Sequence, residues 1–284
     1  KILNLTFTFI VFLISNITYI IINSTVYLGL LYHTYNKSHE KMYHLIENKN
    51  FPNRSYKTGK VISWNIHYGT NSSEHCNLDK MIEFLNEQEA HIIILQEMVT
   101  LKNLDLVELL VKKLNMLDCL FIKEIKFGNY IIGKLILSRT KFSKNNVLEY
   151  EKCIMGNCHN VLMPTIKIYR QEFLLCNIHL NSDLTGYSQN EHIKLLLQEL
   201  EKSKYNGLVK VICGDFNMLP FWQIAKDIKK NFDEFVNDKY TYPANYPIVK
   251  LDYSFISKNN YSNNYNLEVL DCELSDHKPI CFYL

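Results

Sequence analysis

The sequence predicts a mixed α/β sandwich preceded by an N-terminal hydrophobic helix, and three observations support this fold class. Helical patterns alternate with strands and with strand–strand pairs along most of the chain. Several of the strand segments are continuous apolar runs, as is typical of sheets buried on both faces. Residues 2–36 contain no Asp, Glu, Lys or Arg and are long enough to cross a bilayer as a helix.

The N-terminal segment, residues 1–36, is predicted to be a transmembrane or signal-anchor segment that contacts the membrane through residues 2–32. A cleaved signal peptide is the alternative, because polar residues interrupt the apolar run. A buried core helix is less favoured, since such a long uncharged run is uncommon in a soluble domain. The flanking Lys1, Lys37 and Lys41 are nearly balanced and indicate no orientation. The chain is therefore expected to be membrane-anchored or secreted.

Residues 37–58 are rich in Lys, His, Asn and Ser, which predicts a polar tether, so the folded domain is expected at residues 59–284. The domain begins with a strand at 60–66, followed by a loop of turn-forming residues at 69–76. A buried strand is predicted at 91–97. Two stripes with helical spacing are Leu78, Met81, Ile82 and Leu85, and then Leu104, Val107, Leu110, Val111 and Leu114.

The remainder of the domain continues this alternation, with apolar runs that end at polar or turn-forming residues. Helices are predicted at 188–202 and after Pro220. Strands are predicted around 134–138, 161–169, 172–180, 208–216, 251–257, 267–271 and 278–284.

Charge and cysteine content restrict the function classes. The 31 Lys and Arg residues against 29 Asp and Glu give a net charge of +2, so a nucleic-acid substrate would require a local basic patch. Of the eight cysteines, Cys176 and Cys213 fall in apolar strands and are expected to be buried thiols. Cys153 and Cys158 could close a small disulfide loop in an oxidising compartment, or remain thiols elsewhere. No CxxC zinc spacing occurs.

Polar and ionisable residues follow the apolar strands at the points where the strands end. In layered α/β folds, side chains at strand ends converge in a cleft where a ligand binds. A single one of these residues would have an ordinary structural explanation, such as a core histidine for His179, but the whole set points to a site. The set is Asn65, His67, Glu97, His179, Asp215, Asn217, Asp252, Asp276 and His277.

These residue types match the requirements of phosphoester hydrolysis. Magnesium prefers one or two carboxylates together with water and substrate oxygens, and Glu97 is the first choice of ligand. Asp252 and His277 supply a carboxylate–imidazole pair that can position and deprotonate water near neutral pH. Asp215 and Asn217 could hold the attacking water and a phosphoryl oxygen. His179 could contact the phosphate or assist the leaving oxygen.

At these residues the sequence resembles the endonuclease/exonuclease/phosphatase superfamily, a deoxyribonuclease-like group that also includes sphingomyelinases and inositol-polyphosphate phosphatases. The segments SWNIHYG, LQEM, NIHL, CGDFN, LDYSFIS and SDHKP occur in the family's order between residues 59 and 284. The resemblance implies a four-layer sandwich of two mixed β-sheets flanked by helices, with magnesium or manganese as cofactor. It implies metal binding by Asn65, Glu97 and Asp276, and catalysis by His179, Asp215, Asn217, Asp252 and His277. The general base is either the GDFN aspartate or the SDH histidine.

The resemblance leaves one phosphate contact open, because many family nucleases place a Tyr or Arg between the LQE and NxHL segments. Arg139, Tyr130 and Tyr150 are candidates, and Arg139 and His67 are expected in the substrate cleft. The expected activity is a phosphodiesterase with nucleic acid favoured over phospholipid as substrate. The alternative is a sphingomyelinase-like or phosphatase activity on lipid or soluble phosphoesters, and a non-catalytic binding module is less favoured. No protein partner is indicated.

Overall fold

The computed structural model describes residues 43–48, 59–71, 73, 76–149, 160–258 and 266–284. The predicted anchor at 1–36, most of the predicted tether, the pair Cys153 and Cys158, and Tyr150 lie outside these ranges. Within the described part of the chain, no helix is long and apolar enough to span a membrane. All described residues belong to one unit, Met42–Leu284.

The described strands form two mixed β-sheets. The seven-stranded sheet has the order β1 (Tyr43–Glu47), β4 (Asp118–Phe127), β5 (Tyr130–Ser138), β3 (Ile92–Leu101), β2 (Lys60–Asn65), β13 (Ile280–Tyr283) and β12 (Leu267–Val269). The six-stranded sheet has the order β10 (Phe232–Glu234), β11 (Asp252–Ser257), β9 (Val209–Asp215), β8 (Gln171–His179), β7 (Val161–Ile168) and β6 (Phe142–Leu148). Each sheet contains one parallel pair, β2–β3 and β8–β9, among antiparallel neighbours.

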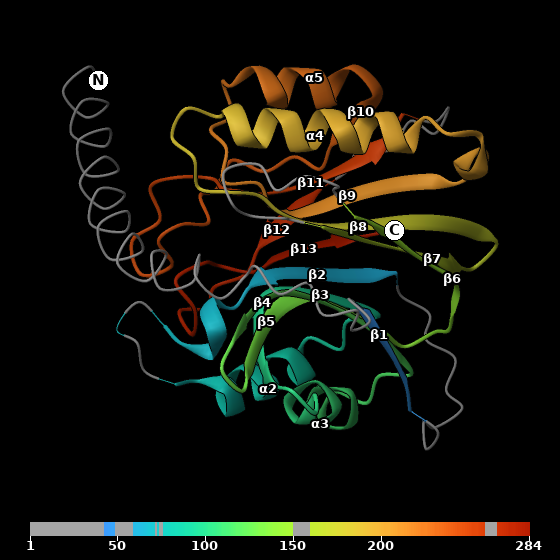
Figure 1. The fold of residues 1–284 in the computed structure, drawn as a ribbon. Coiled ribbons are helices and arrows are strands. Elements are labelled where there is room, and N and C mark those ends of the chain that lie inside the picture. The colour runs from blue at the N-terminus through green and yellow to red at the C-terminus, as the bar shows by residue number, and fades with distance from the viewer. Residues whose placement is uncertain (1–42, 49–58, 72, 74–75, 150–159, 259–265) are drawn as a thin grey trace. The chain divides into compact units, whose positions relative to one another are not determined.

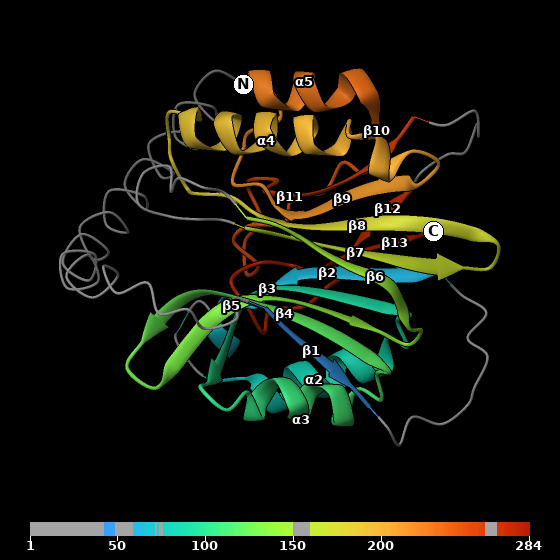
Figure 2. The ribbon, with the colours of Figure 1, turned by 45° about the vertical axis from the view of Figure 1, so that its right-hand side comes forward.

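Helices cover the outer face of each sheet, so the unit has four layers (Figures 1 and 2). Helices α2 (Leu78–Glu87) and α3 (Asp105–Lys113) cover the seven-stranded sheet, while α4 (Tyr187–Leu200) and α5 (Gln223–Asn231) cover the other. Two short 3-10 turns, η1 (His67–Gly69) and η2 (Ser203–Tyr205), complete the described elements. The predicted sandwich of two mixed sheets with flanking helices is confirmed.

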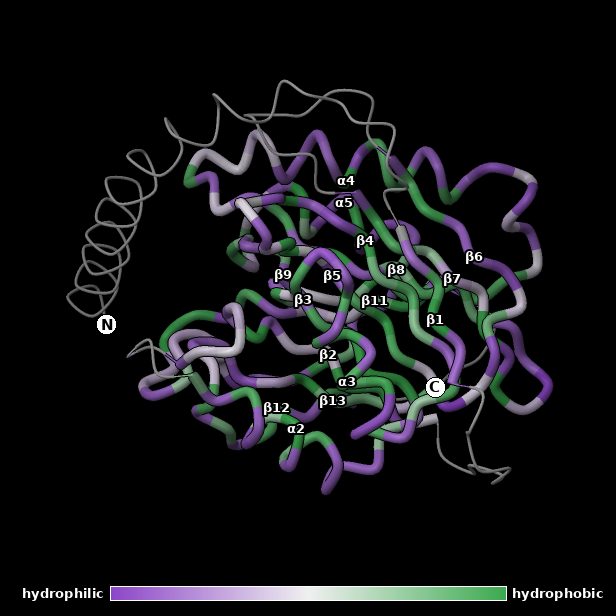
Figure 3. Tube along the Cα trace, turned by 60° about the horizontal axis from the view of Figure 1, so that its bottom comes forward, coloured by the Kyte–Doolittle hydropathy of each residue, from purple (hydrophilic) through white to green (hydrophobic). Residues whose placement is uncertain are grey.

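Three apolar clusters hold these layers together. One cluster lies between the two sheets and includes Ile94, Ile136, Leu175 and Val211. The other two lie between each sheet and its helices. Figure 3 shows apolar residues concentrated along the strands. Each helix buries apolar residues against its sheet, such as Met81, Ile82 and Leu85 of α2, as burial of a single helical face requires. The predicted buried thiols Cys176 and Cys213 are fully buried in these clusters, which confirms that prediction.

Four strands escaped the sequence analysis: the three-residue strand β10, and three strands whose pattern is masked by polar residues. Strand β4 contains Glu124, whose carboxylate forms a buried ion pair with Lys134 of β5 at 2.7 Å, and β6 is a polar edge strand. Strand β1 falls inside the segment predicted to be a tether, and it pairs along its whole length with β4. This part of the predicted tether therefore belongs to the sheet, because an edge strand needs only one hydrogen-bonded neighbour and one buried face.

The topology directs the site residues to one edge. Helix α2 connects β2 to β3, and α4 connects β8 to β9, so each parallel pair is a βαβ unit. The carboxyl ends of parallel strands lie at the same edge of a sheet, where ligands bind in open α/β sheets. Strands β2 and β9 approach each other across the interface between the sheets. The two carboxyl-end edges are thereby brought together.

Candidate active site

The site is built where the two parallel pairs end. Asn65 ends β2, His179 ends β8 and Asp215 ends β9. The Asn65 side-chain amide donates hydrogen bonds to Glu97 Oε1 at 3.0 Å and to Asp215 Oδ2 at 3.1 Å. One buried amide therefore joins a carboxylate of each sheet. The Asn65 Oδ1 accepts a hydrogen bond from the His67 backbone N–H, and the role of Asn65 as a metal ligand stays a prediction.

Glu97 occupies a β-bulge in β3. Its φ is 55°, and the register with β5 shifts between Leu95 and Met98. A bulge re-aims the side chain that it carries, and bulges are frequent beside active sites. Burial and the nearby Asp276 carboxylate raise the pKa of Glu97 to about 7, although the Asn65 hydrogen bond and His67 and His277 lower it. Burial without a compensating cation is what opposes ionisation of this group.

Asp252 and His277 form the predicted carboxylate–imidazole pair. Asp252 Oδ2 lies 2.9 Å from His277 Nδ1, and both side chains are buried. His277 Nε2 lies 3.7 Å from Asp215 Oδ2. Burial lowers the pKa of His277, but Asp252, Asp215 and Asp276 outweigh it and raise the pKa above its usual value. The imidazole is therefore held between two carboxylates with a fixed ring orientation.

The segment before β13 holds His277 in place. The Trp64 indole N–H donates to the His277 carbonyl at 2.8 Å, and the Ser275 hydroxyl donates to the Asn65 carbonyl at 2.7 Å. Each contact joins a residue of β2 to a residue more than 200 positions later in the sequence. The SDH segment is thus tied to the strand that carries Asn65.

Asp215 and Asn217 lie in a tight turn after β9. Asp215 Oδ1 accepts a hydrogen bond from the Asn217 backbone N–H at 2.8 Å, and the Asn217 side-chain amide donates to the Leu180 carbonyl at 2.9 Å. Gly214 precedes them with φ 136°, and a Cβ there would lie 2.0 Å from the Ile178 carbonyl oxygen. Only glycine permits this close approach of β9 to β8. Burial and Asp252 raise the pKa of Asp215 to about 7 against the lowering effect of His277.

The remaining predicted residues differ in how closely they join this cluster. His179 Nε2 lies 3.5 Å from Glu97 Oε1 and 3.9 Å from Asp215 Oδ2, so it belongs to the cluster and not to the apolar core. His67 lies in η1, and its Nδ1 is 3.9 Å from Asp276 Oδ1. Asp276 is partly exposed and is close enough to Glu97 to raise the pKa of that residue.

Arg139 is not in this cluster, which corrects the prediction that it lines the cleft. It follows the end of β5, and its backbone N–H donates to the carbonyl of His91, just before β3. Glu97 lies six residues further along β3, about 20 Å away at the rise of an extended strand. The antiparallel direction of β5 takes Arg139 to the opposite end of the sheet. Tyr130, at the start of β5, lies on the site side and is exposed.

Tyr242 is a site residue that the sequence analysis missed. Its ring centroid lies 4.9 Å from that of His277. Burial raises its pKa to about 12, with further contributions from the carboxylates of Asp276, Asp215 and Glu97. The Ala244 N–H donates to the Asp276 carbonyl at 2.7 Å and fixes this loop against the SDH segment. No motif marks Tyr242, because only the folding of its loop brings it to the cluster.

The donor set fits a divalent cation. Glu97 Oε2 is buried and has no hydrogen-bond partner among the described residues. Such an atom is costly unless it has a partner, and carboxylate oxygens are the ligands that magnesium prefers. Asp215, Asp252 and His277 also lie close enough for three of their atoms to surround an ion. The hydrogen bond between Asp252 and His277 already uses one atom of each, so Glu97 and Asp276 are the better candidates to hold the metal.

We expect the substitution Glu97→Gln to stabilise the metal-free protein more at pH 8 than at pH 5. The Glu97 pKa is 4.5 in the unfolded chain and about 7 when folded, so folding disfavours its ionisation. This penalty is absent at low pH, grows as pH rises from about 4.5 to 7, and reaches about 3 kcal/mol. Thermal unfolding of both proteins in a chelator measures the difference.

The comparison with wild type is needed because His192 changes the stability with pH in the opposite direction to Glu97. Burial lowers its pKa to about 4, so its contribution to stability is lost as pH falls below the unfolded value. Both proteins share that effect, and it cancels in the difference between them. An equal difference at pH 5 and pH 8 would contradict the prediction.

A buried amide pair connects the two sheets directly below the site. Gln96 Nε2 donates to Asn177 Oδ1 at 2.8 Å, and Asn177 Nδ2 donates to the carbonyls of Leu95 and Leu135 at 3.1 Å. Gln96 precedes Glu97, and Asn177 lies two residues before His179. The pair therefore sets the spacing between the halves of the site that the two sheets contribute.

We expect Asn177→Ala to lower the free energy of unfolding by about 3–5 kcal/mol, because it leaves buried amide and carbonyl groups without partners. Urea denaturation measures this loss. Asn231→Ala is the matched control, since Asn231 is exposed and its truncation should cost less than about 0.5 kcal/mol. Equal losses in the two variants would refute the bridging role.

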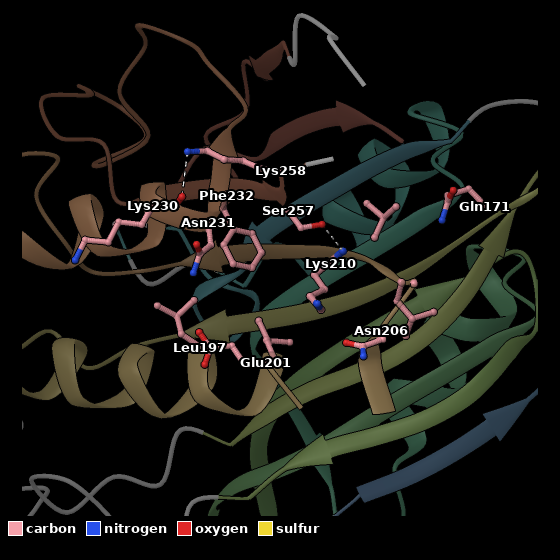
Figure 4. A pocket seen from close by; sticks show the side chains of 14 residues that line it. Gln171, Leu197, Glu201, Asn206, Lys210, Lys230, Asn231, Phe232, Ser257 and Lys258 are labelled. Atoms are coloured by element: carbon pink, nitrogen blue, oxygen red, sulfur yellow. Dashed lines mark hydrogen bonds between the residues drawn. The ribbon is translucent and has the colours of Figure 1, made fainter. Parts of the chain in front are cut away.

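A separate pocket of about 860 Å³ lies at the other end of the six-stranded sheet (Figure 4). Leu197 and Phe232 line it together with Lys210, Lys230 and Lys258. The Lys258 ammonium donates to the carbonyls of Lys229 and Lys230 at the end of α5. Strand β9 begins at this pocket and ends at Asp215, so the pocket is remote from the acidic cluster and contributes nothing to it.

The fold and the cluster together define a hydrolytic centre, with carboxylates for a hard cation and a carboxylate–imidazole pair beside them. The chain belongs to the Endonuclease/Exonuclease/phosphatase family, whose pattern matches residues 62–277. Members of this family are hydrolases that act on phosphoesters and use divalent metal ions. No curated protein matches this sequence significantly.

Solved structures of this family share the fold. An endonuclease/exonuclease/phosphatase family protein from Leptotrichia buccalis is 18% identical, with a TM-score of 0.63 over 78% of this chain and 98% of that one. The human Nocturnin catalytic domain with a bound sulfate anion is 16% identical, with a TM-score of 0.60 over 85% and 96%. A mannosyl-6-phosphatase from Bacteroides thetaiotaomicron is also 16% identical, with a TM-score of 0.60 over 78% and 98%.

Proposed function

We propose that this chain is a divalent-metal-dependent phosphodiesterase that hydrolyses nucleic acid. The observation that carries the proposal is the joining of two half-sites by Asn65, which holds Glu97 of one sheet and Asp215 of the other. Phosphodiester hydrolysis needs a cation site and a water-activating group on either side of one phosphate. Magnesium or manganese held by Glu97 and Asp276 would neutralise charge on the phosphate.

The geometry supports a division of roles between Asp215 and His277. Asp215 has a raised pKa near 7 and accepts the Asn217 N–H, which suits a base that orients and deprotonates water. His277 has a raised pKa and lies between Asp252 and Asp215. The neighbouring carboxylates favour its protonated form, which would donate a hydrogen bond to a phosphoryl oxygen. Asn217 and His179 bind the other phosphoryl oxygens or the leaving oxygen.

Nucleic acid is the proposed substrate for two reasons. The family description names nucleases, and the exposed rings of Tyr187 and Phe221 lie in the segments that follow His179 and Asp215. The net charge of +2 gives no long-range attraction, so binding must rely on contacts near the site. Residues 2–32 are proposed to anchor the chain in a membrane or to direct its secretion. Carbonate extraction of membranes tests the anchor, since release of an intact chain into the soluble fraction would exclude it.

The activity is tested with the 284-residue chain and magnesium on DNA, RNA, sphingomyelin and inositol phosphates, each with and without a chelator. Cleavage of DNA or RNA that the chelator abolishes supports the proposal. Cleavage of sphingomyelin or inositol phosphates alone would replace nucleic acid by a lipid or soluble phosphoester. Turnover of none of them, with a folded and metal-bound protein, would refute the enzymatic proposal.

A further inference from the structure

Two aromatic side chains are exposed at the edge of the sheet that carries the site. Tyr187 begins α4 and is 62% exposed, and Phe221 precedes α5 and is 70% exposed. Each lies in the segment that follows one strand of the parallel pair β8–β9, beyond His179 and Asp215 respectively. Single exposed hydrophobic residues are ordinary, so any role for these two depends on how they are held.

A close packing contact fixes the two segments against each other. Gly186 has φ 72°, and a Cβ at this position would lie 2.9 Å from Cε3 of the Trp222 ring. Trp222 also packs against the apolar cluster beneath α4 and α5. Tyr187 follows Gly186 and Phe221 precedes Trp222, so the exposed residues adjoin the two sides of one rigid contact.

A buried glutamine connects this pair of segments to the catalytic turn. The Gln189 side-chain amide is fully buried and donates to the carbonyls of Asn181 at 2.6 Å, Asp183 at 2.9 Å and Asn217 at 3.2 Å. Phe221 is four residues from Asn217, so their Cα atoms lie within about 14 Å. That distance corresponds to a few nucleotides of a strand, at about 3.4 Å each.

We propose that Tyr187 and Phe221 form a platform on which nucleobases next to the cleaved phosphodiester stack. The inference rests on the proposed nuclease function and names the part of the substrate that this edge recognises. Aromatic rings stack on every base, so the platform gives affinity without sequence preference. Its position beside the catalytic turn places the bases on the α4–α5 side of the site.

A lipid surface fits this edge less well. Asp183 accepts hydrogen bonds from the Thr185 hydroxyl and from the backbone N–H groups of Thr185 and Ser188. Burial raises the pKa of Asp183, but these hydrogen bonds outweigh it and keep the pKa below its usual value. An ionised carboxylate four residues from Tyr187 would be costly to place in a bilayer.

The test compares cleavage of a single-stranded oligonucleotide with cleavage of the same strand carrying abasic sugars on both sides of the scissile linkage. We expect the double variant Tyr187→Ala, Phe221→Ala to lower kcat/KM for the normal strand by about 5- to 100-fold, mainly through KM. The abasic strand should be cleaved equally by variant and wild type. Tyr187→Phe and Phe221→Tyr should restore wild-type cleavage. Tyr283→Ala is the matched control, because Tyr283 is 59% exposed and lies in β13 of the seven-stranded sheet, paired with Lys60 at the start of β2.

Each other outcome overturns the platform. An equal loss on both strands would mean that the rings only stabilise the loops, and no loss on either would mean that they do not contact substrate. Unchanged cleavage with weaker binding to vesicles of phosphatidylcholine and phosphatidylserine would assign the rings to a lipid surface. Wild-type inactivity on both strands would instead refute the proposed function on which this inference rests.

Discussion

Substitution of Asp215 by asparagine is expected to lower kcat about 1,000-fold and to remove the acidic limb of the pH–rate profile. Asparagine keeps the shape of the side chain, and its single carbonyl oxygen can keep one of the hydrogen bonds from Asn65 and the Asn217 N–H, but it cannot accept a proton. Because the pKa of Asp215 is raised to about 7, wild-type activity should fall as pH drops below that value. Initial rates from pH 5 to pH 9 at saturating magnesium measure both effects.

The Asp215→Asn variant should remain folded, since it removes a buried charge that burial disfavours. Its thermal unfolding midpoint in a chelator should equal or exceed that of wild type. Asp79→Asn is the matched control, because Asp79 is exposed on α2 in the outer layer. An unchanged acidic limb in Asp215→Asn would exclude Asp215 as the base.

Replacement of His277 by alanine should lower kcat about 100- to 1,000-fold and remove the basic limb of the same profile. The proposed role requires a protonated imidazole, so wild-type activity should decline as pH rises through the raised pKa of His277. Loss of the acidic limb in His277→Ala would reverse the assignment and make His277 the base. The two variants together therefore distinguish the alternatives that the family resemblance leaves open.

His91→Ala provides the matched control for His277→Ala. His91 is also buried, but it lies before β3 at the end of the sheet opposite the site, with Nε2 3.2 Å from the Thr140 hydroxyl. Its removal should lower stability without changing the pH–rate profile. A profile altered equally in both variants would indicate a general loss of packing and not a catalytic role for His277.

Much of the site was predictable because its chemistry is local to the strand ends. Glu97, His179, Asp215 and His277 each follow or precede an apolar run, and topology brings such ends to one edge. The structure places these residues within one cluster, with His277 bonded to Asp252 as expected. The sequence pattern also predicted the helices and a mixed α/β sandwich, because hydrophobic periodicity reflects burial of one face, while the two mixed sheets were implied by the family resemblance.

The positions of other residues could not be predicted, because they depend on how distant segments of the chain pair and pack. Arg139 carries the charge expected of a phosphate contact, but the antiparallel direction of β5 places it at the opposite end of the sheet. Tyr242 and Gln189 have no recognisable motif and reach the site only through loop packing. Strand β4 was hidden by charges that are satisfied by Lys134 of its neighbour.

The sequence by itself thus determined which chemical groups are present and which strand ends carry them. The tertiary structure decided how these groups act on one another: Asn65 joins two carboxylates, and Gln96 with Asn177 spaces the sheets. The physical reason is that periodicity and residue chemistry are properties of short segments. Strand register, burial and the resulting pKa shifts arise only when segments far apart in the chain exclude water from one another.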